Sequence, residues 1–492
     1  GKSAILLVPE IALTPQLLGL MAAWFGEKVA VLHSSLSDAE RYDQWKRVRQ
    51  GAAGVVVGTR SAVFAPCENL GLIILDEEQE HSYKSENSPR YAAREVAMWR
   101  GHKEGALVLL GSATPSVESM YNAKQGDYRL YRLQNRYNGR ALPETQIVDM
   151  REELKLGNDG TLSIPLRQAI HDTLAADKQA ILLLNRRGNS RALVCVDCRK
   201  APECPRCSER LTYHSANNRL LCHYCGYSVP VPDRCPSCGG PLKTLGTGTQ
   251  RVQQELSALF PDVEVARMDA DTVSASNPHE VILDRFRRGE QKILLGTQMV
   301  AKGLDMPNVT LVGVLDADLS LFTGGFRAGE TTFDMLTQVV GRAGRGSFAG
   351  RAILQTMVPN HELIRLAAQQ DYDRFYDLEI RLRQVQHVPP FADQVLIGFQ
   401  GLQEPQVLMG AAKFRDSLLQ LQRSGNFGPM ELLGPAPSPV PKINYQFRYR
   451  LTLRCRMEKN IRAALCYLLC AFGKDSKMRG VSAFIDVNGF MD

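Results

Sequence analysis

A short apolar run that ends in consecutive carboxylates limits the fold of this chain more than any other feature. Leu72–Leu75 is unbroken Leu and Ile, Gly71 precedes it, and Asp76, Glu77 and Glu78 follow directly. A continuous run of this length, bounded by glycine and by charge, is typical of a strand in a parallel sheet that is covered on both faces. The sequence therefore predicts an α/β fold with a ligand site at the carboxyl end of this strand.

Two adjacent carboxylates at a strand end suit the hydrolysis of a nucleotide. One can hold Mg²⁺ against the β- and γ-phosphates, and the next can orient the attacking water. The alternative is a strand that runs into a solvated acidic turn, and these few residues leave that alternative open.

Composition bounds the class of protein. At 492 residues the chain should hold roughly three domains, and its hydrophobic content of 44% is ordinary for a globular protein. No apolar run approaches the roughly 18 residues that a membrane span needs, and no signal peptide precedes the first strand, so a membrane role is not expected. The net charge of +7 permits a polyanionic partner without requiring one. Because residue 1 is Gly rather than Met, the natural N-terminus is expected upstream.

Eight of the 12 cysteines form four Cys-x-x-Cys pairs. Such pairs in a large, enzyme-like chain indicate metal binding and a reducing compartment rather than disulfides, and two pairs complete one tetrahedral Zn²⁺ site. The loop Ser208–Leu221 is long enough for a hairpin that brings the two inner pairs together, which leaves the outer pairs to meet. We therefore expect two zinc ions, one held by Cys195, Cys198, Cys235 and Cys238, and the other by Cys204, Cys207, Cys222 and Cys225.

The opening Gly1-Lys2-Ser3 matches the end of a Walker A phosphate loop. In such a loop the Lys-Ser pair opens a helix, whereas Ala4–Val8 followed by Pro9 reads as a strand. The sequence therefore predicts a loop that enters a strand, followed by a helix capped by Thr14.

An internal sequence repeat predicts two related lobes. Val55–Arg60 reappears as Ile293–Gln298, and in each copy a second strand ends in an aspartate, at Asp76 and at Asp316. The simplest account is a pair of doubly wound lobes of like design.

A conspicuous basic face is predicted near residue 340. Gln338, Arg342 and Arg345 lie at i, i+4 and i+7, so one helix would present an amide and two guanidinium groups on one side. Gly341 and Gly344 weaken a helix by roughly 1 kcal/mol each relative to Ala, which indicates a close backbone approach there. A solvated basic face is the alternative.

The sequence pattern changes in the last part of the chain. From Pro389 onward we expect a small α+β domain with strands at Gln394–Phe399 and Arg448–Arg454 and a Pro-rich hinge at Gly434–Pro441. Basic and aromatic residues near Tyr445 would let this domain touch nucleic acid, although a role in packing alone is also open.

The acidic turn, Gly111-Ser112-Ala113-Thr114, the Gln338–Arg345 segment and the eight-cysteine insertion together resemble the PriA family of replication-restart DNA helicases, in superfamily 2. The resemblance covers essentially the whole chain. It implies an α/β fold of two RecA-like doubly wound parallel-sheet lobes, a two-zinc insertion in the second lobe and a small α+β C-terminal domain. The expected domains are lobe 1 at 1–140, the linker and start of lobe 2 at 141–194, the zinc insertion at 195–241, the rest of lobe 2 at 242–388 and the C-terminal domain at 389–492.

The resemblance also implies roles for residues. Asp76 would bind Mg²⁺, Glu77 would activate water, and Arg342 and Arg345 would reach the γ-phosphate of ATP. The remaining nucleotide and coupling residues would be Gln79, Ser112, Thr114, Gly303, Asp305 and Gln338. Gln79 stands where many members of the family have His, and either side chain can form the hydrogen bond. The candidate DNA contacts are Thr59, Arg60, Tyr83, Lys84, Arg90, Tyr91, Thr297, Gln298 and Lys302, whose alternative is an ordinary turn or surface loop.

The function implied is ATP-dependent 3′→5′ unwinding of DNA at stalled or repaired replication forks, with primosome assembly. The implied partners are forked and single-stranded DNA, single-stranded DNA-binding protein, primosome proteins and the helicase loader, in the bacterial cytoplasm at the nucleoid. The N-terminal DNA-binding region and the Walker A loop of the family would lie upstream of Gly1, so residues 1–492 alone are expected not to hydrolyse ATP.

Two other functions stay open. One is a zinc-dependent primosome scaffold without its own ATPase, and the other is an RNA helicase of the same superfamily. Asp76 and Glu77 together with Arg342 and Arg345 favour an enzyme, because a scaffold needs no acids opposite arginines. The two-zinc insertion argues against an RNA helicase.

Overall fold

The computed structural model describes residues 1–10, 13, 15–133, 142–184, 191–198, 200–214, 219–222, 224–245, 249–268, 279–297, 306–322, 325–344, 348–424 and 427–489. The chain forms two compact units, of which the first ends at Arg140 and the second begins at Ala141. Within the described ranges, no helix combines the length and the hydropathy that a membrane crossing requires.

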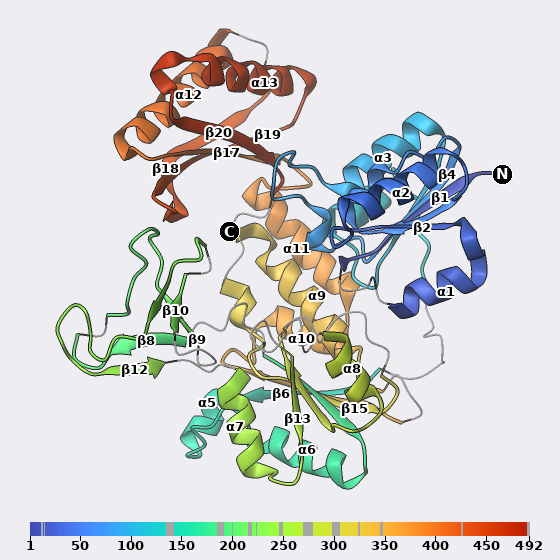
Figure 1. Cartoon of the computed structure of the whole chain (residues 1–492), viewed down its shortest axis with the longest axis vertical. Coiled ribbons are helices and arrows are strands. Elements are labelled where there is room, and N and C mark those ends of the chain that lie inside the picture. Colours follow the sequence, from blue (N-terminus) through green and yellow to red (C-terminus); the bar gives the residue numbers. More distant parts are fainter. Residues whose placement is uncertain are drawn as a thin grey trace. The chain divides into compact units, whose positions relative to one another are not determined.

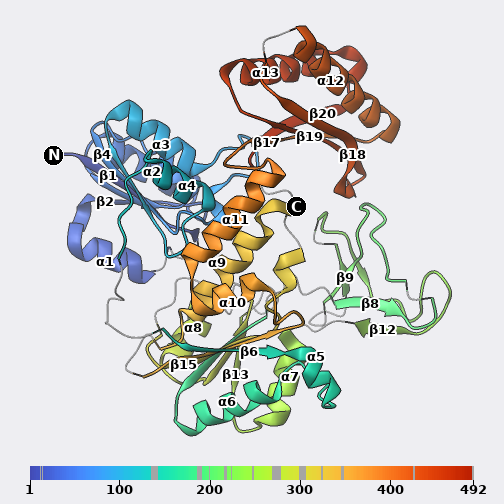
Figure 2. The same ribbon diagram turned by 180° about the vertical axis from the view of Figure 1, so that it is seen from behind.

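The first unit is a five-stranded parallel sheet with helices (Figure 1, blue). Its strand order is β2-β3-β1-β4-β5. The strands are β1 (Ser3–Leu7), β2 (Val29–Leu32), β3 (Val55–Gly58), β4 (Leu70–Asp76) and β5 (Leu107–Gly111), and the α-helices are α1 (Pro15–Phe25), α2 (Asp38–Arg49), α3 (Ala93–Glu104) and α4 (Val117–Gln125), the last labelled in Figure 2.

The start of the chain is a strand, as predicted. Ser3 opens β1, and its N–H donates to the carbonyl of Asn69 at 2.7 Å, next to β4. Gly1-Lys2-Ser3 therefore leads into a strand and does not open a helix. The predicted cap Thr14 lies outside the described residues, and α1 begins at Pro15.

The core of the first unit lies on one face of its sheet. Alternate strand residues such as Ile73 and Leu75 are fully buried with side chains from α2 and α3, whereas Leu72 and Ile74, on the opposite face, are only half-buried. The face opposite this core is therefore covered only in part by the described residues, whereas the sequence predicted a strand covered on both faces.

The second unit contains a six-stranded parallel sheet in the order β13-β14-β7-β15-β16-β6. Its strands are β6 (Glu144–Asp149), β7 (Gln179–Leu183), β13 (Val265–Met268), β14 (Ile293–Gly296), β15 (Val309–Val314) and β16 (Arg351–Thr356). Its helices are α5 (Met150–Lys155), α6 (Ile164–Ala175), α7 (Thr249–Leu259), α8 (His279–Arg287), α9 (Ala328–Val340), α10 (Glu362–Gln369) and α11 (Tyr372–Gln386).

The two parallel sheets have corresponding strand orders, which confirms the two related lobes predicted from the internal repeat. The repeated segments form β3 and β14. In the first sheet β1 lies between β3 and β4, and in the second sheet β7 lies in the same way between β14 and β15. In the second sheet β6 lies beside β16, but β5, the counterpart of β16, is an edge strand among the described residues. Leu107 and Leu109 of β5 are accordingly 67% and 47% exposed.

The cysteine-rich segment forms its own sheet, in the order β11-β10-β9-β8-β12. The strands are β8 (Arg191–Cys195), β9 (Thr212–His214), β10 (Arg219–Leu221), β11 (Ser228–Pro230) and β12 (Leu242–Leu245). Antiparallel pairing of β8 with β12 closes the insertion at its base.

The C-terminal part is an antiparallel sheet in the order β18-β19-β17-β20, with α12 and α13 together on one face (Figures 1 and 2). Its elements are β17 (Asp393–Gly401), α12 (Glu404–Ser424), β18 (Met430–Ile443), β19 (Gln446–Cys455), α13 (Lys459–Lys474) and β20 (Val481–Val487). The predicted strands are confirmed, but the Pro-rich segment Gly434–Pro441 is not a hinge. It belongs to β18, an edge strand, where missing proline N–H groups can be tolerated.

Candidate nucleotide site and zinc centres

The acidic turn is held in a conformation that an ordinary chain avoids. β4 ends at Asp76, and Glu77 has φ of 49°, in the left-handed region that non-glycine residues adopt at a cost of order 1–3 kcal/mol. The Glu77 N–H donates to Oδ1 of Asp76 at 3.1 Å, and the Tyr83 hydroxyl donates to the Asp76 carbonyl at 2.7 Å. The surrounding structure thus fixes where the two carboxylates point.

The electrostatics of this turn suit a bound cation. Desolvation, and then the neighbouring Glu77 carboxylate, raises the pKa of Asp76. A divalent cation between the two groups would remove this disadvantage of the charged form. Asp76 and Glu77 are therefore chemically suited to hold Mg²⁺, which prefers carboxylate oxygens and water.

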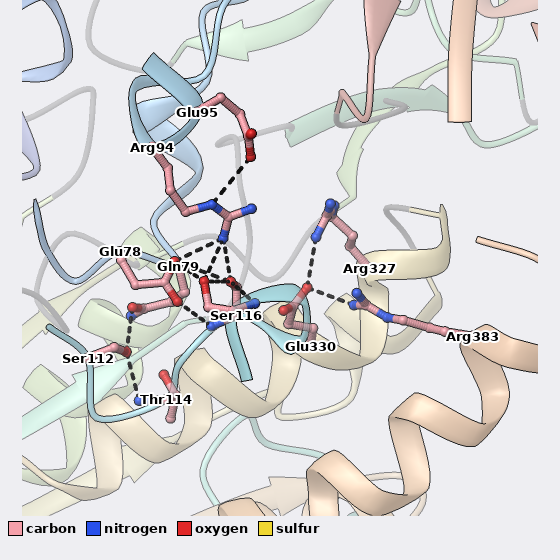
Figure 3. A network of polar contacts seen from close by, with 11 residues as sticks. Glu78, Gln79, Arg94, Glu95, Ser112, Thr114, Ser116, Arg327, Glu330 and Arg383 are labelled. Atoms are coloured by element: carbon pink, nitrogen blue, oxygen red, sulfur yellow. Dashed lines mark hydrogen bonds and ion pairs between the residues drawn. The ribbon is translucent and has the colours of Figure 1, made fainter. Parts of the chain in front are cut away.

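A chain of hydrogen bonds joins the acidic turn to the end of β5 (Figure 3). The Gln79 amide donates to the Glu77 carboxylate at 2.8 Å and accepts from the Ser112 hydroxyl at 2.6 Å. The Thr114 N–H in turn donates to Ser112 Oγ at 2.9 Å. These three bonds connect the Glu77 carboxylate to the Ser112-Ala113-Thr114 turn.

Glu78 was not among the predicted site residues, yet its carboxylate is buried and hydrogen-bonded to several groups. It is 4% exposed and accepts from the Arg94 guanidinium at 2.9 Å and from the Ser116 N–H at 2.7 Å. The hydroxyls of Ser116 and Ser119 also lie within hydrogen-bond distance of it, at 3.2 and 3.1 Å (Figure 3 draws the Ser116 and Arg94 contacts). Ser116 is recognisable in the sequence as the N-cap of α4, but its pairing with Glu78, 38 positions away, is not.

We expect Glu78→Ala to destabilise the first unit by about 3–5 kcal/mol, because it leaves the Arg94 guanidinium without its buried partner. Urea unfolding followed by tryptophan fluorescence measures this, because all three tryptophans, Trp24, Trp45 and Trp99, belong to the first unit. The matched control is Glu95→Ala. Glu95 also pairs with Arg94, at 3.7 Å, but its side chain is 72% exposed, so less than about 1 kcal/mol should be lost. Equal losses in the two variants would contradict this assignment.

The candidate DNA contacts of the first unit divide into two groups. Tyr83 is 3% exposed and belongs to the core, so the prediction that it stacks on bases is wrong; its ring packs inward while its hydroxyl holds the acidic turn. Thr59 is 4% exposed as well, and its side chain offers little surface to a phosphate. Arg60 donates to the carbonyls of Ser82 and Lys84 at 3.1 and 2.6 Å, so it also shapes the loop.

The second group lies on the 84–92 hairpin. Lys84 forms a β-bridge with Ala92, and Tyr91 stacks edge-on against Phe64 at 4.8 Å. Lys84, Arg90 and Tyr91 are each half-buried. Their roles in DNA binding therefore stay a proposal.

In the second unit, the predicted helical face is not formed by its two described members, Gln338 and Arg342. α9 ends at Val340, and Arg342, which is 9% exposed, lies in the turn beyond it. Gly344 has φ of 70°, and a Cβ on it would meet the backbone nitrogen of Gly350 at 2.5 Å. The close approach inferred from the glycines is thus confirmed at Gly344, but it lies beyond the end of α9 and not within the helix.

Several predicted site residues fall outside the described ranges: Gln298, Lys302, Gly303, Asp305 and Arg345. Thr297 is described and follows β14 directly. Gln338 lies in the last turn of α9 and is half-buried.

Buried charges join the start of α9 to α11. The Arg383 guanidinium, with no exposed surface, donates to Glu330 at 2.8 Å and to Glu379 at 3.0 Å, and Arg327 donates to Glu330 at 3.2 Å (Figure 3 shows Arg327, Glu330 and Arg383). Removing one partner would leave a charge buried, so this cluster fixes the helix that carries Gln338.

The eight paired cysteines form two tetrads, with the nested partners that the spacing predicted. Within each tetrad all four sulfur atoms lie within 4.8 Å of one another. We call Cys195, Cys198, Cys235 and Cys238 the outer site, and Cys204, Cys207, Cys222 and Cys225 the inner site. Four converging free thiols match a tetrahedral Cys₄ zinc site.

Comparison with known proteins assigns the family. The DEAD/DEAH box helicase family matches residues 1–123, the helicase conserved C-terminal domain 246–347, the PriA DNA helicase Cys-rich region 204–230 and the primosomal protein N C-terminal domain 384–489. The replication restart protein PriA of Rickettsia felis is 36% identical over 95% of this chain and 72% of that protein. The chain belongs to the PriA replication restart family. The two parallel sheets with their helices are accordingly RecA-like helicase lobes, and the two tetrads are structural zinc sites.

Other relatives are also PriA proteins. That of Bacillus subtilis is 45% identical over the whole of this chain, and that of Synechocystis is 42% identical over 92% of it. The chain spans 61% and 55% of the length of these two relatives.

We expect two zinc ions per chain by elemental analysis, and loss of the fold around one ion when a ligand such as Cys198 is changed to Ser. The free energy of binding a structural zinc ion stabilises the fold of the zinc module itself. Loss of the ion should therefore unfold this module and leave the lobes folded. Tryptophan fluorescence, which reports the first lobe alone, should stay unchanged. One ion per chain, or unfolding of the first lobe, would contradict the assignment.

Proposed function

We propose that the complete protein is an ATP-dependent 3′→5′ DNA helicase that unwinds stalled or repaired replication forks and promotes primosome assembly. The observation that carries the proposal is the bonded path from the acidic turn through Gln79 to Ser112. Asp76 holds Mg²⁺, Glu77 orients the attacking water, and the path passes the state of the nucleotide to the Ser112–Thr114 turn. Arg342 and Arg345 stabilise the γ-phosphate, while Gln338, Gly303 and Asp305 complete the nucleotide and coupling residues.

The substrate proposed is forked and single-stranded DNA. Arg60, Lys84, Arg90 and Tyr91 of lobe 1 contact the strand by charge and stacking, and Thr297, Gln298 and Lys302 do so from lobe 2. The family assignment supports DNA over RNA, since the matched cysteine-rich region is that of a DNA helicase. Primosome proteins, a helicase loader and single-stranded DNA-binding protein are the proposed partners, in the bacterial cytoplasm at the nucleoid.

A zinc-dependent scaffold is the second candidate, favoured by the two zinc sites. It differs from the helicase in needing no nucleotide chemistry. The backbone strain at Glu77 favours the helicase over the scaffold. A glutamate in the left-handed conformation costs stability, and a scaffold would have no need of it at this position.

The test compares ATP hydrolysis by the chain extended upstream through the phosphate loop, with forked DNA, duplex RNA or no nucleic acid. We expect forked DNA to stimulate turnover most, and Glu77→Gln to abolish it while forked DNA still binds. Stimulation by duplex RNA alone would favour an RNA helicase. DNA binding without any hydrolysis would favour the scaffold.

A further inference from the structure

The tip of the β18–β19 hairpin is bonded to the inner zinc site. The Asn444 N–H donates to Sγ of Cys207 at 3.2 Å, although the two residues are 237 positions apart. Two further backbone bonds flank it: the Tyr445 N–H donates to the Arg206 carbonyl at 2.7 Å, and the Ser208 N–H donates to the Lys442 carbonyl at 2.9 Å. The hairpin tip therefore pairs with the whole Arg206–Ser208 knuckle rather than with one atom of it.

Side chains reinforce these three bonds. Ile443 packs against the apolar cluster that contains Cys204, Cys207 and Cys222. The Arg206 guanidinium lies 6.0 Å from the ring centre of Tyr445 and 5.2 Å from that of Tyr227, within the range of cation–π attraction. The contact thus combines backbone pairing, apolar burial and ring–cation contacts.

The turn itself is shaped for this contact. Asn444 and Tyr445 have φ of 47° and 64°, as a two-residue hairpin turn of the primed type requires. A left-handed tyrosine is strained, and such strain persists only where neighbours hold it. Here the neighbour is Arg206, which binds the N–H of Tyr445 and faces its ring.

The outer site has a different donor. There the backbone donors to the ligand sulfurs come from the same knuckle: the Ser237 N–H lies 3.4 Å from Sγ of Cys235, and the Gly240 N–H bonds to Cys238. The inner site also has such local donors, since the Arg206 N–H bonds to Cys204 and the Tyr227 N–H to Cys225, but it receives one further amide, that of Asn444, from the C-terminal domain. Groups that bond to metal ligands orient them and commonly change metal affinity by about 10–100-fold.

We propose that residues 442–445 act as an outer-sphere clamp on the inner zinc ion, and that this ion in turn holds the C-terminal domain on the insertion. The two effects are one coupling free energy, because a clamp that strengthens zinc binding must be strengthened by zinc to the same extent. Within the described ranges, no hydrogen bond joins the C-terminal domain to the outer site, so we expect no such coupling for the outer ion. The proposal does not depend on the helicase activity.

The first test uses zinc-loaded full chains and hydrogen exchange at the amides of Ser208, Asn444 and Tyr445. In Cys222→Ser, which removes a ligand that does not bond to the hairpin, exchange at these amides should accelerate at least about 10-fold. In Cys235→Ser, which removes an outer ligand, it should not change. Equal acceleration in both variants, or none in Cys222→Ser, would overturn the proposal.

The second test leaves all eight thiols in place and measures zinc affinity by competition with a chelator. Asn444→Val should lower the affinity for one of the two ions about 10–100-fold, because a β-branched residue disfavours positive φ and moves the amide away from Cys207. Asn444→Gly is the matched control, since glycine keeps both the turn and the N–H, and it should bind both ions normally. Unchanged affinity in Asn444→Val, or weakening of both ions, would overturn the proposal.

Discussion

Arg345→Ala is expected to lower ATP turnover by about 10³–10⁵-fold in the chain extended through its phosphate loop, while affinity for forked DNA stays nearly unchanged. A guanidinium at the γ-phosphate stabilises charge that develops in the transition state, so its removal affects hydrolysis rather than strand binding. Steady-state ATPase rates and equilibrium binding of labelled fork DNA measure the two effects separately.

Arg374→Ala is a suitable control for that variant. Arg374 lies on α11 of the same unit with its side chain 69% exposed, so the same loss of charge should leave turnover near that of the parent chain. If Arg345→Ala instead weakened DNA binding steeply and turnover survived, Arg345 would belong to the nucleic-acid surface.

Residues 1–492 by themselves are expected to show no DNA-stimulated ATP hydrolysis, and extension upstream through a glycine-rich loop should restore it. The β- and γ-phosphates need backbone amides and a Lys to hold them before Asp76 and Glu77 can act. Gly1-Lys2-Ser3 cannot provide this, because Ser3 already begins β1. ATPase assays of the two chains side by side, with and without forked DNA, measure the difference.

The same comparison has a structural readout. β5 is an edge strand with exposed Leu107 and Leu109, which favours edge-to-edge association. The extended chain should therefore aggregate less at equal concentration if its added strand pairs with β5, as β6 pairs with β16. ATP hydrolysis by the short chain that disappears in Lys2→Ala would show that Gly1-Lys2-Ser3 is a phosphate loop after all.

Short sequence patterns were sufficient to predict those strands and metal sites whose formation depends mainly on residues close together in the chain. The apolar run before Asp76 predicts β4 because a strand of this kind needs only its own side chains and a bounding glycine and charge. The repeated segments predict β3 and β14, and hence two sheets of one strand order. The nested cysteine spacing predicts both zinc tetrads, since a short loop leaves few ways to pair the knuckles.

Only the tertiary structure shows which polar residues are buried and stabilise the fold, and which remain accessible for binding or catalysis. Tyr83 and Glu78 look alike in the sequence as surface residues near a site, yet both are buried, one against the core and the other against Arg94. α9 ends before Arg342, and Gly344 beyond it packs on Gly350, a contact that no helical period reveals. The bond from Asn444 to Cys207 joins residues 237 positions apart. Such pairings depend on where distant strands and loops meet, and that is set by the packing of the whole unit rather than by any local pattern.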